Sequence, residues 1–184
     1  MRLLLIDNHS KHIKEILKNF VNTEVVDFKN FKNYKKFDAV ILSGGSSLSV
    51  KNHSREYYKE LALIKSCNKP ILGICLGFEL INFAFGEDLI RVDSKIKGVM
   101  EIKVLNSDKL FNLLPKRFKV FESHRWIVKE NKSLKTLAKS YYGIEAVKHP
   151  KKEIYGVQFH PEVFIKNDKG VKILKNFVNI VNNS

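Results

Sequence analysis

The nine residues from Pro70 to Phe78, PILGICLGF, constrain the fold of this chain more than any other segment. A short apolar run leads into Gly73-Ile74-Cys75-Leu76-Gly77, and a second apolar segment follows. Small residues on both sides of a cysteine let the backbone turn sharply between a strand and a helix, so the side chain at the turn projects into a cleft. The pattern therefore predicts a strand, a tight turn that carries Cys75, and a helix whose N-terminal N–H groups stabilise a thiolate.

Segments on both sides of this turn carry strand and helix patterns in alternation. The first half of the chain offers short apolar strands at 2–6, 24–28, 37–42 and 70–74. Apolar residues at helical spacing predict a helix capped by Ser10, a helix over 52–67 and a helix over 76–85. Alternating strands and helices are typical of a parallel sheet that helices cover on both faces.

The second half has short apolar segments with few helices between them. Strands are expected at 89–92, 99–105, 118–122, 134–138, 144–147 and 154–159. Apolar residues at helical spacing between Val171 and Val181 predict a closing helix. We therefore expect an α/β fold with an open, mostly parallel sheet, helices on both faces and a small antiparallel extension. One domain is expected to span residues 1–184.

Composition limits the partners and the location of the protein. The net charge of +14 comes mostly from lysines spread over every segment, without an arginine-rich arm or a basic strip interleaved with aromatic residues. This pattern favours a solvated basic surface over a nucleic-acid-binding one. No apolar run approaches the roughly 20 residues that span a bilayer, and the N-terminus lacks a signal-peptide pattern. We expect a cytoplasmic protein with no nucleic-acid partner and no membrane partner.

Several residues that could carry chemistry are interpreted as structural or solvated. Cys67 and Cys75 lie eight positions apart across a predicted strand, so we expect no disulfide. Cys67 ends a predicted helix without a candidate partner, which indicates an inert thiol. His9 and His12 are interpreted as exposed residues at the start of a helix and not as metal ligands. No metal site and no cofactor are expected.

A nucleophilic cysteine requires a base, and one of the six histidines stands out. His160 follows the apolar segment 154–159 and precedes Pro161 and Glu162. In extended backbone, residues two positions apart point to the same side, so Glu162 can bind one ring nitrogen while the other faces Cys75. We therefore expect Cys75, His160 and Glu162 to act as nucleophile, base and orienting carboxylate.

Six short motifs are spread over nearly the whole chain. They are Leu5-Ile6-Asp7-Asn8, Leu42-Ser43-Gly44-Gly45, Gly73-Ile74-Cys75-Leu76-Gly77, Glu122-Ser123-His124, Ile144-Glu145-Ala146-Val147 and Tyr155-Gly156-Val157-Gln158-Phe159-His160-Pro161-Glu162. Together they resemble the class I, or triad-type, glutamine amidotransferase family. The last motif is the most specific, and its position after the cysteine turn makes chance agreement improbable. The surroundings of Ser123 and of Glu145 are most similar to the separate glutaminase subunits of GMP synthetases.

This resemblance implies a flavodoxin-like core and the hydrolysis of glutamine to glutamate and ammonia. The Cys75 thiolate would attack the side-chain amide, His160 would move the proton, and the N–H groups of Gly45 and Leu76 would bind the oxyanion. The substrate-binding residues that the family pattern implies are Glu79, Ser123, His124, Arg125 and Trp126, and for His124 a structural role stays equally open. Because 184 residues leave no room for a synthetase module, the resemblance also implies a separate synthetase subunit that receives the ammonia.

The chain departs from the family pattern at three positions. Glu79 replaces a glutamine, Ser46 replaces a proline, and Trp126 replaces the aspartate usual in GMP synthetase subunits. A carboxylate at position 79 would repel the thiolate and would pair poorly with the substrate carbonyl unless it is protonated. Two other interpretations therefore stay open. One is a catalytically impaired protein with a sensing or regulatory role, and the other is an autonomous thiol hydrolase of another γ-glutamyl amide.

Overall fold

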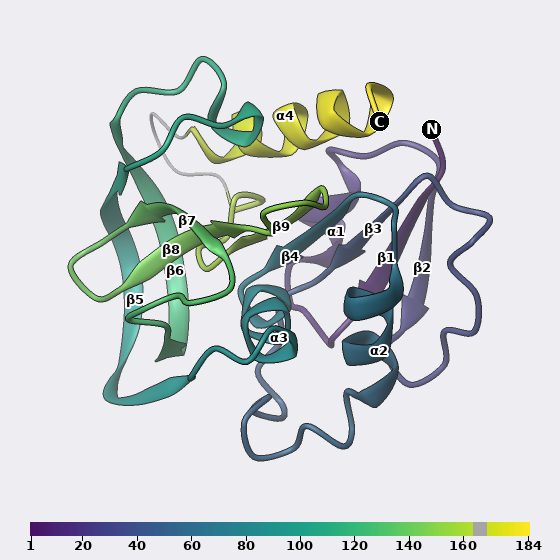
Figure 1. Cartoon of the computed structure of the whole chain (residues 1–184), viewed down its shortest axis with the longest axis horizontal. Coiled ribbons are helices and arrows are strands. Elements are labelled where there is room, and N and C mark those ends of the chain that lie inside the picture. The colour runs from purple at the N-terminus through teal and green to yellow at the C-terminus, as the bar shows by residue number, and fades with distance from the viewer. Residues whose placement is uncertain (164–168) are drawn as a thin grey trace.

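A computed structural model of the protein describes residues 1–163 and 169–184. Within these residues, nine strands form one sheet in the order β2-β1-β3-β4-β9-β8-β7-β5-β6 (Figure 1). The strands are β1 (Leu3–Asp7), β2 (Thr23–Asp27), β3 (Ala39–Leu42), β4 (Ile71–Ile74), β5 (Ile90–Val104), β6 (Arg117–Ile127), β7 (Lys135–Lys139), β8 (Ile144–Lys148) and β9 (Ile154–Val157). The helices are α1 (Ile13–Leu17), α2 (Tyr58–Ser66), α3 (Leu76–Ala84), a short 3₁₀ helix η1 (Lys109–Phe111) and α4 (Gly170–Asn182). The expected α/β architecture is confirmed.

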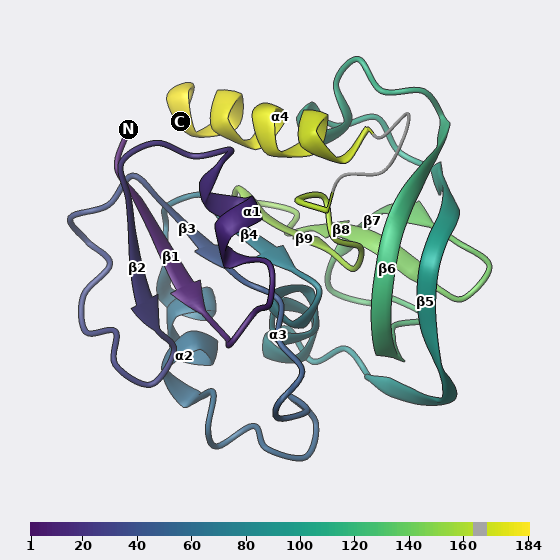
Figure 2. The same ribbon diagram turned by 180° about the vertical axis from the view of Figure 1, so that it is seen from behind.

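The strands β2, β1, β3, β4 and β9 pair in parallel and form one half of the sheet. Successive side chains of a strand point to opposite faces, so Leu3 and Leu5 join one core cluster while Leu4 and Ile6 join another. Helices α1 and α4 contribute to the first cluster, and α2 and α3 contribute to the second. The two views show these helix pairs on opposite faces (Figures 1 and 2). Burial on both faces explains why these strands are continuously apolar.

The other half of the sheet is antiparallel, and the hairpin of β5 and β6 dominates it. The segments expected as separate strands at 89–92 and 99–105 belong to one 15-residue strand, β5. The intervening residues 93–98 include a single apolar side chain, the buried Ile96, among polar and mostly exposed neighbours, so they carry little apolar signal. Pairing with β6 continues on both sides of a register shift between Arg91 and Ile96, and this pairing keeps the strand extended.

Two helix starts differ from the sequence prediction. The helix expected over 52–67 begins only at Tyr58, because the preceding residues form turns. The hydroxyl of Tyr57 donates to the carbonyl of Leu48 (2.9 Å) and fixes these turns against the core. Ser10 does not cap α1, which begins after His12; its hydroxyl accepts from the His12 N–H two residues on (3.1 Å). No helix among the described residues combines the length and the apolar character needed to cross a bilayer.

The carboxyl ends of β1, β3, β4 and β9 meet at one edge of the parallel half. The residues that directly follow these strands are Asn8, Ser43, Cys75 and Gln158. In open α/β sheets, this edge is where ligands bind. The fold therefore brings four distant parts of the chain to one candidate site.

Candidate active site

Cys75 occupies the turn between β4 and α3. Its backbone has φ 51° and ψ −99°, a left-handed conformation that residues with a side chain rarely adopt. The Cys75 N–H donates to the carbonyl of Val157 on β9 (2.8 Å), and its carbonyl accepts from the Glu79 N–H (3.0 Å). These two bonds fix the cysteine between the sheet and the first turn of α3. The positive end of the helix dipole therefore lies at Cys75.

Glycines on both sides of Cys75 permit this turn. A Cβ atom at Gly73 would lie 2.4 Å from the carbonyl oxygen of Gly77, and a Cβ atom at Gly77 would lie 2.4 Å from that of Leu42. Any side chain at either position would force α3 away from β3 and β4. The predicted sequence of strand, tight turn and helix is confirmed.

His160 and Glu162 follow β9 and lie next to the cysteine. The His160 N–H donates to the carbonyl of Phe121 on β6 (2.9 Å), and its Nδ1 lies 2.8 Å from Oε1 of Glu162. The Cys75 side chain is close enough to His160 to raise the pKa of the imidazole. Both His160 and Glu162 are buried. A proton on Nδ1 that is donated to Glu162 leaves Nε2 for the cysteine, so the three side chains have the expected arrangement.

Electrostatics favour a charged imidazole beside the cysteine. Burial alone would lower the pKa of His160, but the Cys75 thiolate and the hydrogen bonds to Cys75 and Glu162 outweigh it and raise the pKa to about 10. His160 therefore stays protonated near neutral pH. A protonated imidazole in this position is able to donate a proton to a leaving group.

Two adjoining hollows meet at Cys75. The first has a volume of about 300 Å³, and its lining includes every residue expected to bind the oxyanion or the substrate: Gly45, Leu76, Glu79, Ser123, His124, Arg125 and Trp126. The second, of about 290 Å³, is lined by residues that include His160, Lys11 and His12. The structure thus brings all the predicted site residues together, with Glu162 buried behind His160.

The N–H groups of Gly45 and Leu76 are free donors at this site. Both residues border the first hollow beside Cys75. Within the described residues, neither N–H has a hydrogen-bond acceptor. Two unpaired backbone donors near a nucleophile are able to stabilise an oxyanion.

Glu79 is buried in the wall of the first hollow. Its side chain has no hydrogen-bond or ion-pair partner among the described residues. Burial raises the pKa of Glu79 to about 8, so the side chain is mostly a neutral carboxylic acid near neutral pH. A neutral acid has one O–H donor and one carbonyl acceptor, as a glutamine amide has donors and an acceptor.

Glu122 and His124 on β6 form a buried polar cluster with Glu145 on β8. Their possible ligand atoms lie within 4.8 Å of one another, so among the described residues this is the group that could hold a metal ion. However, both nitrogens of His124 are already bonded, Nδ1 to the carbonyl of Trp126 (2.9 Å) and Nε2 to Glu122 (2.5 Å). Burial lowers the pKa of His124 and raises the pKa of Glu122 to about 7. A neutral imidazole that accepts from a protonated Glu122 fits these directions, so the cluster serves to hold the strand that lines the hollow.

The sequence predicted no role for Gln158 at this site, and it predicted the wrong exposure for His12. The Gln158 side chain lies beneath the cysteine, with Nε2 4.0 Å from Sγ of Cys75. It stands within a motif of the sequence, but nothing in its spacing assigns it a role. His12 was expected to be exposed, yet it is half-buried and its ring packs against that of His160, with centroids 5.4 Å apart. His9 is exposed as predicted, and its Nε2 lies 2.7 Å from Asp27.

Comparisons with known proteins agree with this geometry. The family model of class-I glutamine amidotransferases matches residues 4–181. A glutamine-hydrolyzing GMP synthase subunit of Pyrococcus abyssi is 35% identical, with 97% of each chain covered. The protein of the same name from Methanobrevibacter smithii is 34% identical, with 90% of this chain and 82% of the relative covered.

Solved structures show the same fold. A provisionally named GMP synthase subunit from Thermoplasma acidophilum has a TM-score of 0.88 and 25% identity, covering 100% of this chain and 94% of the other. A glutamine amidotransferase from Thermotoga maritima has a TM-score of 0.74 and 21% identity, covering 100% and 83%. The match of the family model over nearly the whole sequence is decisive. The chain belongs to the class I glutamine amidotransferase family.

Proposed function

We propose that this chain is the glutaminase subunit of a two-subunit GMP synthetase. It hydrolyses glutamine to glutamate and ammonia, and it supplies the ammonia to a separate synthetase subunit. The observation that carries this proposal is the hollow of about 300 Å³ beside Cys75 and its partner His160. The relatives named as GMP synthase subunits support the assignment to an enzyme of separate chains, since the Pyrococcus abyssi protein is covered over 97% of its length.

The first half of the proposed reaction forms a thioester. The Cys75 thiolate attacks the amide carbon of glutamine, and the carbonyl electrons move onto oxygen. The N–H groups of Gly45 and Leu76 stabilise this oxyanion, and the loss of one such donor typically costs about 3 kcal/mol of barrier. His160 donates its Nε2 proton to the amide nitrogen, the C–N bond breaks, and ammonia leaves.

The second half restores the enzyme. Neutral His160 accepts a proton from water, and the resulting hydroxide attacks the thioester carbon. A second oxyanion forms at the same two N–H groups and collapses, which releases glutamate and returns the thiolate. Glu162 keeps the imidazole in one orientation throughout, because its carboxylate binds Nδ1 at 2.8 Å.

Glu79 decides between this proposal and the two other interpretations. Since Glu79 is mostly uncharged near neutral pH, it neither repels the Cys75 thiolate strongly nor attracts a cationic substrate. A neutral carboxylic acid is able to hydrogen-bond the substrate much as an amide does. A neutral Glu79 therefore favours a working glutaminase over an impaired protein and over a hydrolase of cationic amides.

Replacing Glu79 with glutamine is expected to change the pH dependence of glutamine hydrolysis more than its rate. Near pH 7, kcat/KM should stay within about threefold, since both side chains are neutral. As the pH rises through about 8, Glu79 ionises while His160, with a pKa of about 10, stays protonated. The wild-type rate should therefore fall at about pH 9, and the variant should retain its activity there. Initial rates measured from about pH 6 to pH 10 test this expectation.

The same substitution is expected to change stability with a defined sign. Folded Glu79 keeps its proton up to about pH 8, whereas the unfolded side chain loses it near the ordinary value of 4.5. Between these values the folded state holds the extra proton, so the free energy of unfolding of the wild type decreases as the pH rises. In urea unfolding the glutamine variant should show a shallower decrease than the wild type, because buried Glu60 and Glu122 also have raised pKa values. The control Glu130→Gln, at an exposed position, should show the same decrease as the wild type. A large gain in activity near pH 7 would instead support the impaired protein, and no hydrolysis of glutamine by either form would support another substrate.

The proposed function is tested with the synthetase subunit of the same organism. Glutamine-dependent GMP formation by the two chains together, under conditions where the synthetase alone requires added ammonium, is the expected result. A diazo-ketone analogue of glutamine should add once to the protein, at Cys75, as measured by intact-mass spectrometry. No adduct and no GMP formation in the presence of the partner would contradict the proposal.

We also infer a cytoplasmic location, because both cysteines are free and a reducing compartment keeps them so.

A further inference from the structure

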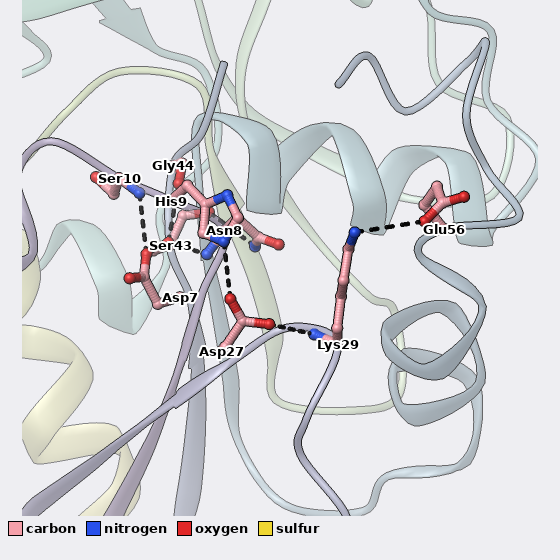
Figure 3. Close-up of polar contacts among 9 residues, drawn as sticks. All are labelled: Asp7, Asn8, His9, Ser10, Asp27, Lys29, Ser43, Gly44 and Glu56. Carbon is pink, nitrogen blue, oxygen red and sulfur yellow. Dashed lines mark hydrogen bonds and ion pairs between the residues drawn. The ribbon is translucent and has the colours of Figure 1, made fainter. Parts of the chain in front are cut away.

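The loop that follows β3 is held by the loop that follows β1. The Ser43 N–H donates to the carbonyl of Ile6 (3.0 Å), and the Asn8 N–H donates to Oγ of Ser43 (2.8 Å). The side-chain amide of Asn8 donates to the carbonyl of Ser43 (3.2 Å) and to the buried Glu60 carboxyl (3.1 Å). Figure 3 shows Ser43 between Asn8 and Gly44. Ser43 and Asn8 are almost completely buried, so these bonds are shielded from water.

The hydroxyl of Ser43 has one proton and two possible acceptors. Its oxygen lies 2.8 Å from the carbonyl oxygen of Gly44 and 3.5 Å from Oδ1 of Asp7. The first distance is optimal for an O–H···O bond, and the second is at its outer limit. The Ser43 hydroxyl therefore donates its proton to the Gly44 carbonyl, while Oγ accepts a hydrogen bond from the Asn8 N–H.

This bond fixes the direction of the next N–H group. The carbonyl of Gly44 and the N–H of Gly45 belong to one planar, trans peptide unit, in which they point in opposite directions. The carbonyl points to Ser43, on the side of β1. The Gly45 N–H therefore points away from β1, and Gly45 borders the hollow that contains Cys75.

A peptide between two glycines turns more easily than most, because neither residue has a side chain to limit its rotation. No proline follows to restrict the loop, since the next two residues are exposed serines. Close packing leaves little room for a side chain in this loop: a Cβ atom at Gly45 would lie 2.2 Å from the Asn8 carbonyl oxygen, and one at Gly44 would lie 3.1 Å from Cε1 of His160. Packing against glycines does not by itself fix the direction of a carbonyl, whereas the hydrogen bond from the Ser43 hydroxyl to the Gly44 carbonyl does.

We propose that Ser43 is a positioning residue for the oxyanion donor, its hydroxyl holding the Gly44–Gly45 peptide so that the Gly45 N–H faces the reacting carbonyl oxygen. This inference rests on the proposed function. Without the hydroxyl, the peptide turns over, and its carbonyl then faces the cleft where the N–H is required.

The test is Ser43→Ala, compared with wild type and with the exposed control Ser47→Ala. For Ser43→Ala we expect kcat for glutamine to fall by about 10- to 100-fold with KM within about threefold, since the donor acts mainly in the transition state. Alkylation of Cys75 by iodoacetamide should proceed at the wild-type rate, because displacement at a saturated carbon forms no oxyanion. A variant that is merely misfolded would expose the buried Cys67 as well, so it would be alkylated at both cysteines. Ser43→Thr, which keeps a hydroxyl, should retain most of the kcat.

An unchanged kcat in Ser43→Ala, or an equal loss in Ser43→Thr at equal stability, overturns the proposal. If the alanine variant does not fold, Ser43→Cys keeps most of the volume with a weak donor and should show the same selective loss of kcat. If the wild type and its synthetase partner hydrolyse no glutamine, the proposed function fails separately. In that case, a crystal structure of Ser43→Ala tests the positioning role of Ser43. A Gly44–Gly45 peptide that has turned over supports the inference, and a peptide oriented as in the wild type refutes it.

Discussion

Replacing Cys75 with alanine is expected to reduce glutamine hydrolysis by about 10⁴-fold or more, because removal of a triad nucleophile leaves only binding and the oxyanion donors. The fold should persist, since alanine needs no more room than cysteine and the turn is held by backbone bonds to Val157 and Glu79. The pKa of His160 should also fall from about 10, because part of what raises it is the thiolate itself. Ammonia release and an NMR titration of the His160 ring measure the two effects.

Cys67→Ala is the matched control for this experiment. Cys67 is buried and free, and among the described residues its sulfur bonds only to the backbone of Lys69, so its loss should cost some stability but no chemistry. This variant should still form one adduct with the diazo-ketone analogue of glutamine, and Cys75→Ala should form none. Residual turnover in Cys75→Ala above a hundredth of the wild-type rate would exclude a thioester mechanism.

The local sequence pattern predicts the short buried strands of the fold but not the full length of β5. The buried strands β1, β3, β4 and β9 are short apolar runs, and their burial on both faces produces that pattern directly. The pattern splits β5 into two strands because residues near Asp93 are polar and exposed. Only the partner strand β6, distant in sequence, keeps them extended. Long-range pairing of this kind leaves no local signal.

In the candidate site, too, some residues are identifiable from the local sequence and others are not. Cys75, His160 and Glu162 are identifiable from the sequence because a turn, a proline and a spacing of two residues have direct chemical meanings. Asn8 and Ser43 stand in motifs that assign them no role, although they follow adjacent parallel strands. The rule that such positions meet at one edge would have grouped them with Cys75. The protonation of Glu79 was not predictable, since it depends on burial that only the packed structure provides.

Replacing His160 with glutamine is expected to lower kcat by about 10³- to 10⁴-fold. Among the described residues, no other side chain next to Cys75 is able to donate a proton to the leaving amide nitrogen. Gln158 is the nearest alternative, but its amide Nε2 lies 4.0 Å from Sγ and cannot exchange a proton near neutral pH. The variant should bind glutamine with little change in KM, since His160 does not line the hollow where the substrate is expected.

Alkylation by iodoacetamide separates the two roles of His160 in this variant. The rate should fall, because the imidazolium no longer stabilises the thiolate. Turnover should fall by a much larger factor, since a thiolate without a proton donor cannot expel ammonia. Exposed His53→Gln is the control and should match the wild type in both reactions. If turnover and alkylation fell by the same factor, His160 would only stabilise the thiolate, and the proton donor would have to be sought elsewhere.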